Sequence, residues 1–226
     1  MTYLFDGSIL SAYFQSNGTA YDVKTLDTAG NLVTMDGGLA RKRKAELAEL
    51  ITIVDCPKLN AIGTPKNKEQ PLSSNWMGLD AKLKDDRLLK LKNSTYNFFF
   101  NHAAGGSSVN MWATLKAHRT ALKGKGYSRG FTPVNLKATN KYMDRKNLAY
   151  LVNVFMRPRL LKYFAGCGVV PNEELYAISQ LVQWVWRSQI RVGKPIVLYL
   201  PSQRMRELFK DWLADEINQK LIPRAA

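Results

Sequence analysis

Two glutamines and two arginines recur at the spacing of one helical face between Glu174 and Arg191. On a helix that turns about 100° per residue, with Gln183 at 0°, Arg187 falls at about 40°. Gln180 falls at about 60° and Arg191 at about 80°, whereas the apolar residues fill the opposite side. A guanidinium is permanently charged, planar and bidentate, so this stripe suits a fixed anionic target. A solvated helix face is the alternative interpretation.

A second candidate is the loop Lys123–Gly130, in which Lys123, Lys125 and Arg129 are interleaved with three glycines and Tyr127. Glycines allow close approach of phosphates to the backbone, and an aromatic ring can stack on a base. We therefore expect a nucleic-acid contact here, with a mobile surface loop as the alternative. The stretch Ala104–Ser108 is a weaker candidate, since its backbone amides could cradle a phosphate or form only a tight turn.

The overall charge points to the same kind of partner. The 226 residues include 33 lysines and arginines against 18 acids, a net charge of +15. Such an excess repels itself in a compact fold and is best explained by a polyanion. We expect DNA or RNA in single-stranded form. An anionic membrane is the other candidate, but no apolar run approaches the ~20 residues of a transmembrane helix, so no membrane partner is expected.

Metal and disulfide chemistry find little support. Cys56 and Cys167 are far apart and have no cysteine or histidine at ligand spacing. His102 and His118 are isolated from cysteines and from paired carboxylates. The first residues lack the basic start and apolar core of a signal peptide. We expect no metal site and a cytoplasmic location, in a bacterium or a phage-infected host cell.

The elements that must position these residues differ between the two parts of the chain. The first part is expected to contain short strands over 2–35 with a hairpin turn at Asn17-Gly18, a helix over Leu39–Val54, a loop rich in proline and glycine over 55–79, and a charged helix over Asp80–Lys92.

The second part has a different pattern. It predicts the strand Tyr96–Asn101, a helix over Val109–Lys123, the strand Phe131–Thr139, helices over most of 144–191, and the strand Ile196–Leu200. Ser202 is expected to cap a last helix. The apolar positions of that helix, spaced for burial, are Met205, Leu208, Phe209, Trp212 and Ile217. Strands separated by helices predict a parallel sheet with helices on its faces.

Three segments in this second part resemble motifs of superfamily-two helicases of the DEAD/DEAH-box type, as carried by phages and mobile elements. Gln183–Arg191 with Gly193 and the following strand resembles the last motif. Val134–Asn140 resembles a strand that ends in Ala-Thr-Asp, and Asn97–His102 resembles the strand that opens the second RecA-like domain. The resemblance covers residues 93–215. Trp186 replaces the usual glycine, and the second arginine follows the first by four residues instead of three.

The resemblance implies roles for individual residues. Arg187 and Arg191 would reach the γ-phosphate of ATP across an interdomain cleft, as arginine fingers. Gln183 would link the nucleotide site to the domain interface. Thr139 and Asn140, with the neighbouring Lys141, would contact the nucleic-acid backbone.

The chain lacks the other half of such an ATPase. It has no Gly-x-x-x-x-Gly-Lys-Ser/Thr loop to hold a triphosphate, and Asp215-Glu216 lies late on the last helix and not after a buried strand. ATP and magnesium would therefore be bound mainly by a partner, an N-terminal helicase domain or subunit that carries the Walker motifs.

The sequence thus predicts an α/β fold with two regions. Residues 1–92 form a small N-terminal α+β region with hairpin, helix and linker, and residues 93–226 form a RecA-like parallel sheet flanked by helices. The expected function is the second core domain of a nucleic-acid-dependent ATPase. The alternative is a non-enzymatic nucleic-acid-binding accessory protein of a phage or mobile element.

Overall fold

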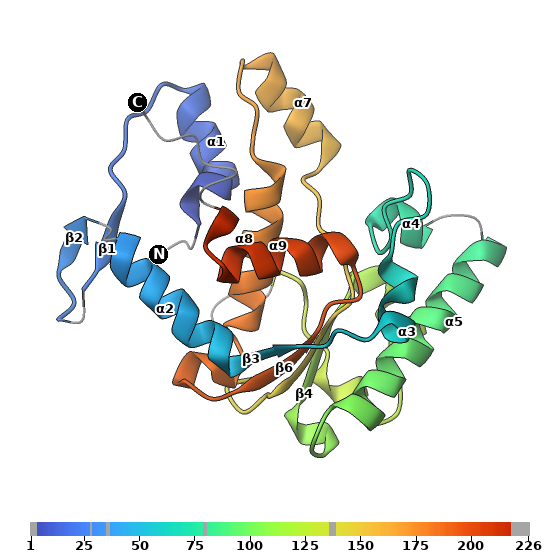
Figure 1. Ribbon diagram of the computed structural model, residues 1–226. Helices are drawn as coiled ribbons and strands as arrows, with labels where there is room; N and C mark the ends of the chain where they lie inside the picture. Colours follow the sequence, from blue (N-terminus) through green and yellow to red (C-terminus); the bar gives the residue numbers. More distant parts are fainter. Residues whose placement is uncertain (1–3, 28, 35–36, 79–80, 136–138, 218–226) are drawn as a thin grey trace.

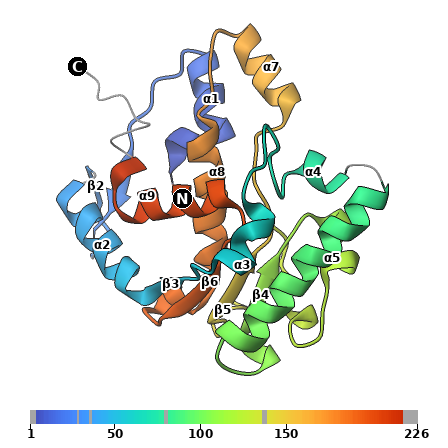
Figure 2. The same cartoon turned by 45° about the vertical axis from the view of Figure 1, so that its right-hand side comes forward.

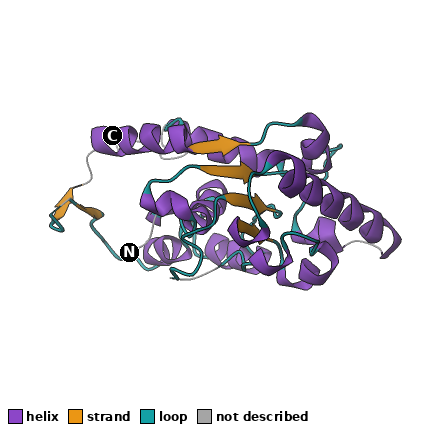
Figure 3. Cartoon of the chain, turned by 90° about the horizontal axis from the view of Figure 1, so that it is seen from below, coloured by secondary structure: helices purple, strands orange, loops and turns teal. Residues whose placement is uncertain are grey.

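The computed structural model of the chain describes residues 4–27, 29–34, 37–78, 81–135 and 139–217. At its centre lies a four-stranded sheet in the order β3-β6-β5-β4. Its strands are β3 (Ile51–Ile53), β4 (Asn110–Ala113), β5 (Asn147–Tyr150) and β6 (Ile196–Tyr199). All of them run parallel, and Figure 3 shows them side by side between helices. The expected α/β class, with a parallel sheet flanked by helices, is confirmed.

Helices cover both faces of the sheet (Figure 1). One face packs against α2 (Gly37–Leu50), α8 (Glu173–Val185) and α9 (Gln203–Leu213), and the other against α3 (Pro57–Asn60), α4 (Ser74–Gly78) and α5 (Ala81–Asn97). Successive strand residues alternate between these two cores. Met111 and Leu148 belong to the first, whereas Trp112 and Ala149 belong to the second. The short helix α6 (Arg119–Leu122) lies between β4 and β5 in the chain.

The N-terminal region contains a hairpin, but not at the predicted place. The residues before Asn17-Gly18 form helix α1 (Ile9–Ser16), which begins where the hydroxyl of Ser8 accepts a hydrogen bond from the amide of Ser11. The hairpin instead joins β1 (Lys24–Leu26) to β2 (Leu32–Thr34). There the carboxylate of Asp27 accepts hydrogen bonds from the amides of Ala29 and Asn31, and these bonds stabilise the turn between the two strands.

The predicted strand Tyr96–Asn101 and the predicted helix Val109–Lys123 are both wrong. Residues 96–101 continue α5 into a wider helical turn, Phe98–His102, and do not form a strand. Their burial follows helical spacing, because Leu91, Thr95, Phe98 and Phe99 are buried while Phe100 is exposed. The helix predicted over Val109–Lys123 is replaced by β4 and the short α6.

The remaining strands also differ from expectation. The predicted strand Phe131–Thr139 is reduced to a single parallel bridge between Phe131 and Trp112, and 136–138 lie outside the described residues. Strand β5 lies inside the region predicted as helical, and β3 inside the helix predicted over Leu39–Val54. All four residues of β4 and of β5 are buried, so neither strand shows the alternation that marks a half-exposed strand.

The last two elements are confirmed. Strand β6 covers the predicted Ile196–Leu200 except its final residue, and the hydroxyl of Ser202 accepts a hydrogen bond from the amide of Met205 at the start of α9. The five apolar positions predicted for the last helix are all buried, but Ile217 lies beyond the end of α9 at Leu213. Since β3 precedes residue 92 and β4, β5 and β6 follow it, the sheet takes strands from both of the expected regions.

Candidate nucleic-acid interface

The carboxyl ends of the strands are the usual ligand side of an open α/β sheet, where neighbouring strands send their connections to opposite faces. Strands β3 and β6 are such a pair, because β3 continues into α3 on one face and β6 into α9 on the other (Figure 2). The chain's own residues fill this place. The hydroxyl of Tyr199 donates to the carbonyl of Leu59 at 2.7 Å, and a Cβ atom on Gly63 would lie 1.9 Å from the carbonyl oxygen of Pro201.

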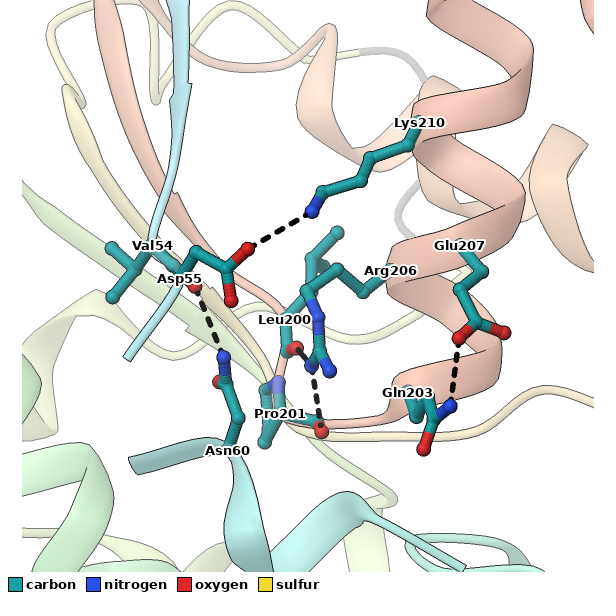
Figure 4. A network of polar contacts seen from close by, with 9 residues as sticks. All are labelled: Val54, Asp55, Asn60, Leu200, Pro201, Gln203, Arg206, Glu207 and Lys210. Carbon is teal, nitrogen blue, oxygen red and sulfur yellow. Dashed lines mark hydrogen bonds and ion pairs between the residues drawn. The ribbon is translucent and has the colours of Figure 1, made fainter. Parts of the chain in front are cut away.

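The polar groups at these carboxyl ends bind one another (Figure 4). The guanidinium of Arg206 donates to the carbonyls of Leu200 (2.8 Å) and Pro201 (3.2 Å). Lys210 forms an ion pair of 3.2 Å with Asp55 just after β3. The Arg206 contacts satisfy strand-end carbonyls that would otherwise need another partner. The polar groups at these ends therefore have structural roles.

The amino ends of β4 and β5 hold two loops in place. The side-chain amide of Asn147, the first residue of β5, donates to Asn110 Oδ1 at 2.9 Å and to the carbonyl of Ala104 at 3.0 Å. The side-chain amide of Asn110, the first residue of β4, donates to the carbonyl of Gly126 at 2.9 Å. Both asparagines are buried. They fasten the Ala104–Ser108 turn and the Lys123–Gly130 loop to the sheet.

A pocket of about 140 Å³ opens between these two loops and the end of α5. Aromatic, polar and glycine residues line it together: Tyr96, Phe99, Phe100, Gly105, Ser107, Asn110, Lys125 and Gly126. Gly105 (φ 109°) and Gly126 (φ 83°) occupy left-handed backbone conformations that favour glycine. The side chain of Lys146 lies over Gly105, since its Cε atom would be 3.1 Å from a Cβ atom there. Lys125 therefore lines the pocket, and Lys146 lies beside one of its lining glycines.

Further cations gather along the same edge of the sheet, which we call the amino edge. Lys146 immediately precedes β5, and Lys194 precedes β6 by two residues. Lys125, Lys141, Arg191 and Lys194 are exposed. Between Asp86 and Glu173 the sequence has 15 lysines and arginines and a single acidic residue, Asp144, which pairs with Arg145 at 3.3 Å. Closely spaced cations with so little compensation produce a positive potential that attracts polyanions.

Contrary to the sequence prediction, the two arginines do not share one helix with the two glutamines. Helix α8 ends at Val185, and Ser188 is extended, so Arg191 falls in a separate 3-10 turn, Gln189–Val192. Ser188 causes this break, because its hydroxyl donates to the carbonyl of Val185 at 2.7 Å and competes with the helical hydrogen bonds. Gln183 and Arg187 are half-buried. Nε of Arg187 is buried, with no hydrogen-bond partner among the described residues.

The residues expected to contact nucleic acid lie beside one of the expected arginine fingers. Nη1 of Arg191 donates to Oδ1 of Asn140 at 2.8 Å. The hydroxyl of Thr139 accepts from the amide of Lys141 at 3.2 Å. Ala138 lies outside the described residues. The structure thus joins Arg191, which the helicase resemblance assigned to ATP, to the group assigned to nucleic acid.

The glycine loop keeps its cations but not its predicted stacking ring. Lys123, Lys125 and Arg129 are exposed, whereas Tyr127 is fully buried. The Tyr127 hydroxyl donates to the carbonyl of Leu122 at 2.7 Å, and burial raises the pKa of this phenol. The exposed rings beside this loop belong instead to Tyr96 and Phe100. Their four-residue spacing at the end of a charged helix is the sequence signal that could have revealed them.

The described residues contain neither a candidate metal site nor a candidate membrane span. Among the described residues, no three histidine, cysteine, aspartate or glutamate side chains come together as a metal site would require. None of the described helices combines the length and apolar character needed to cross a bilayer.

Comparison with known proteins gives one family and one relative. Residues 45–213 match the family described as the YonV C-terminal Rossmann-like domain. The chain is 36% identical over 219 residues to the SPbeta prophage-derived uncharacterized protein YonV of Bacillus subtilis (strain 168). The match covers 96% of the chain and 52% of that relative, so the chain spans about half of the relative's length. No solved structure matches.

Proposed function

Because the chain belongs to the YonV C-terminal Rossmann-like domain family, we propose that it is the nucleic-acid-binding domain of a phage-type protein and that it binds through its amino edge. One observation carries the proposal: the amino edge is open and cationic, whereas the carboxyl edge is filled by α3 and the residues after it. The long stretch with a single acidic residue supplies most of these cations.

The chemistry is that of phosphate recognition. Lys125, Lys141 and Lys194 present ammonium groups to solvent from three segments that meet at this edge. Phosphate contacts of this kind give affinity and position but carry no sequence information. Each contact releases condensed counterions, so binding weakens steeply as salt rises.

A titration of a labelled single-stranded oligonucleotide, followed by fluorescence anisotropy, tests the proposal. With six or more phosphate contacts, affinity should fall by an order of magnitude or more between 50 and 200 mM salt, since log K falls by roughly 0.7 per contact for each unit of log salt. Absence of binding at 50 mM salt, or binding that salt does not change, contradicts the proposal.

A helicase-type ATPase half is the second candidate. The observation that favours it is Arg187, whose Nε is buried with no hydrogen-bond partner in the described structure, an unsatisfied donor that a bound group would explain. In this function ATP and magnesium are held by a partner domain with the Walker motifs, and Arg187 stabilises phosphoryl charge in the transition state.

Reconstitution tests this second candidate. The partner domain, encoded upstream or in another chain, is added to the purified chain, and phosphate release is measured with and without nucleic acid. The helicase interpretation predicts hydrolysis that Arg187→Ala abolishes while oligonucleotide binding is retained. Hydrolysis by the chain alone, or an active Arg187→Ala complex, contradicts it.

A further inference from the structure

Two exposed aromatic rings border the amino edge where its backbone is most open. Tyr96 and Phe100 are 40% and 70% exposed. Their rings are stacked, with centroids 5.6 Å apart and planes 13° from parallel. Exposed apolar residues are common singly, but adjacent exposed rings form a contiguous apolar surface of the kind that marks contact sites.

The pair is fixed in place by the core beneath it. Phe98 and Phe99, between the two exposed rings in sequence, are buried. Phe99 stacks on Tyr127 with centroids 4.9 Å apart, and Phe98 stacks on Tyr199 of β6 at 5.1 Å. The wider helical turn Phe98–His102 thus anchors on its buried side and presents Phe100 on the other. A ligand would meet rings that are already ordered.

Apart from its aromatic rings, the pocket's lining is polar or glycine. Gly105 and Gly126 line it with Ser107 and Lys125. Lys146 lies over Gly105. A pocket lined by flat apolar rings together with hydroxyl, amide and ammonium groups suits a ligand that has a planar π-surface and an adjacent negative charge. An unpaired base with its phosphate has both properties, whereas in a duplex the bases are stacked within the helix and present only their edges in the grooves.

We propose that Tyr96 and Phe100 form a base-stacking platform, with Lys125 and Lys146 binding the adjoining phosphates, so that the amino edge selects single-stranded over double-stranded nucleic acid. This inference rests on the proposed nucleic-acid function and specifies its substrate. Stacking tolerates any base, so the platform recognises strandedness and not sequence.

The test compares three labelled probes of equal length: a thymidine 20-mer, an abasic 20-mer with the same phosphates, and a duplex. The wild-type chain should bind the thymidine strand more tightly than either other probe. Phe100→Ala should weaken thymidine binding roughly 10- to 100-fold, in line with the usual cost of losing a stacking ring, and leave the abasic strand unchanged. Phe100→Leu, which keeps apolar surface without a ring, should behave like Phe100→Ala, and Phe100→Trp should retain binding.

Two controls separate stacking from charge and from folding. Tyr13→Ala removes a ring of similar exposure (49%) from α1, whose residues include no cation, and should change nothing. Lys125→Gln should weaken the thymidine and abasic strands alike, since both carry the same phosphates. Thermal unfolding of each variant verifies that the fold is intact.

Each remaining outcome is decisive. Equal affinity for the thymidine and abasic strands in the wild-type chain overturns the platform while leaving phosphate binding intact. A base preference that survives both Phe100→Ala and Tyr96→Ala overturns it as well. Failure of all three probes to bind at 50 mM salt overturns the proposed function itself, and the rings would then serve a protein partner.

Discussion

Asn147 donates its side-chain amide to Asn110 across the first residues of two neighbouring strands, at 2.9 Å, with both residues buried. The same amide reaches the carbonyl of Ala104, and Asn110 in turn reaches the carbonyl of Gly126. One buried pair thereby fixes both loops that line the pocket. Sheet register and site geometry are consequently linked at this point.

This link predicts the effect of Asn147→Ala. The change leaves the buried Oδ1 of Asn110 without its donor, which costs about 1–3 kcal/mol, and it releases the carbonyl of the exposed residue Ala104. We expect a loss of that size in the free energy of unfolding, measured by urea denaturation, together with weaker oligonucleotide binding. Asn101→Ala removes an exposed side-chain bond to Asn97 and is the matched control. Equal stability of the two variants would contradict the structural role of Asn147.

Gly63→Ala tests whether the segment after β3 packs against the carboxyl ends of the strands. The new methyl group would lie 1.9 Å from the carbonyl oxygen of Pro201, so the backbone must move, at a cost of about 1–3 kcal/mol or more. Gly166→Ala, at the end of α7 (Pro158–Gly166), meets no atom within 4 Å and should be neutral or slightly stabilising. Urea unfolding curves of the two variants measure the difference. A Gly63→Ala chain as stable as Gly166→Ala would mean that the 3-10 turn Ala61–Gly63, which follows α3, does not pack on the residues after β6.

Asp215 predicts a stability change with pH. Partial burial raises the pKa of its carboxyl, but hydrogen bonds and charges of Lys44 and Arg41 outweigh this, so the pKa lies below its ordinary value of 3.8. A carboxyl with a lowered pKa stabilises the fold above its unfolded pKa, and this contribution is lost as pH falls through the folded pKa.

The matching variant is Asp215→Asn, because asparagine tolerates the left-handed backbone at this position (φ 61°). It should lower the free energy of unfolding by about 1–3 kcal/mol near neutral pH, where Lys44 is left buried without this partner. The difference from wild type should shrink in acid and vanish below both pKa values. A difference that is constant from neutral pH into strong acid would rule out an ionised Asp215 as its source.

Part of this architecture could be predicted from the sequence because its signals are local. Strand β6 is preceded by Gly193 and Pro195, and Ser202 caps α9 directly after it. Strands β4 and β5 have no such signal, since each is four residues long and buried throughout. Their identity as strands depends on pairing with each other and with β6, which is information distant in sequence.

The candidate site likewise combines features with a local sequence signal and features that depend on tertiary packing. Net charge and the glycine loop predicted exposed cations, and Lys123, Lys125 and Arg129 are exposed, because an excess of charged side chains must face solvent wherever the chain folds. Which aromatic ring is exposed depends on tertiary packing. Gly124 leaves room for the ring of Tyr127, whose hydroxyl would be 2.6 Å from a Cβ atom there, so Tyr127 turns inward. Tyr96 and Phe100 remain outside because Phe98 and Phe99 fill the core below them.

The most direct test of the central claim compares two triple variants of equal charge. One replaces the amino-edge residues Lys125, Lys141 and Lys194 by glutamine. The other replaces Lys58, Lys66 and Lys68 by glutamine; these three follow the carboxyl end of β3. All six lysines are exposed. The affinity of each for a thymidine 20-mer is measured as a function of salt. The amino-edge variant should lose at least tenfold in affinity at 50 mM salt, and its slope of log K against log salt should shrink by about 2, as loss of three phosphate contacts requires. The opposite-side variant should retain the wild-type slope. Equal losses in the two variants, or a larger loss in the second, would contradict binding through the amino edge.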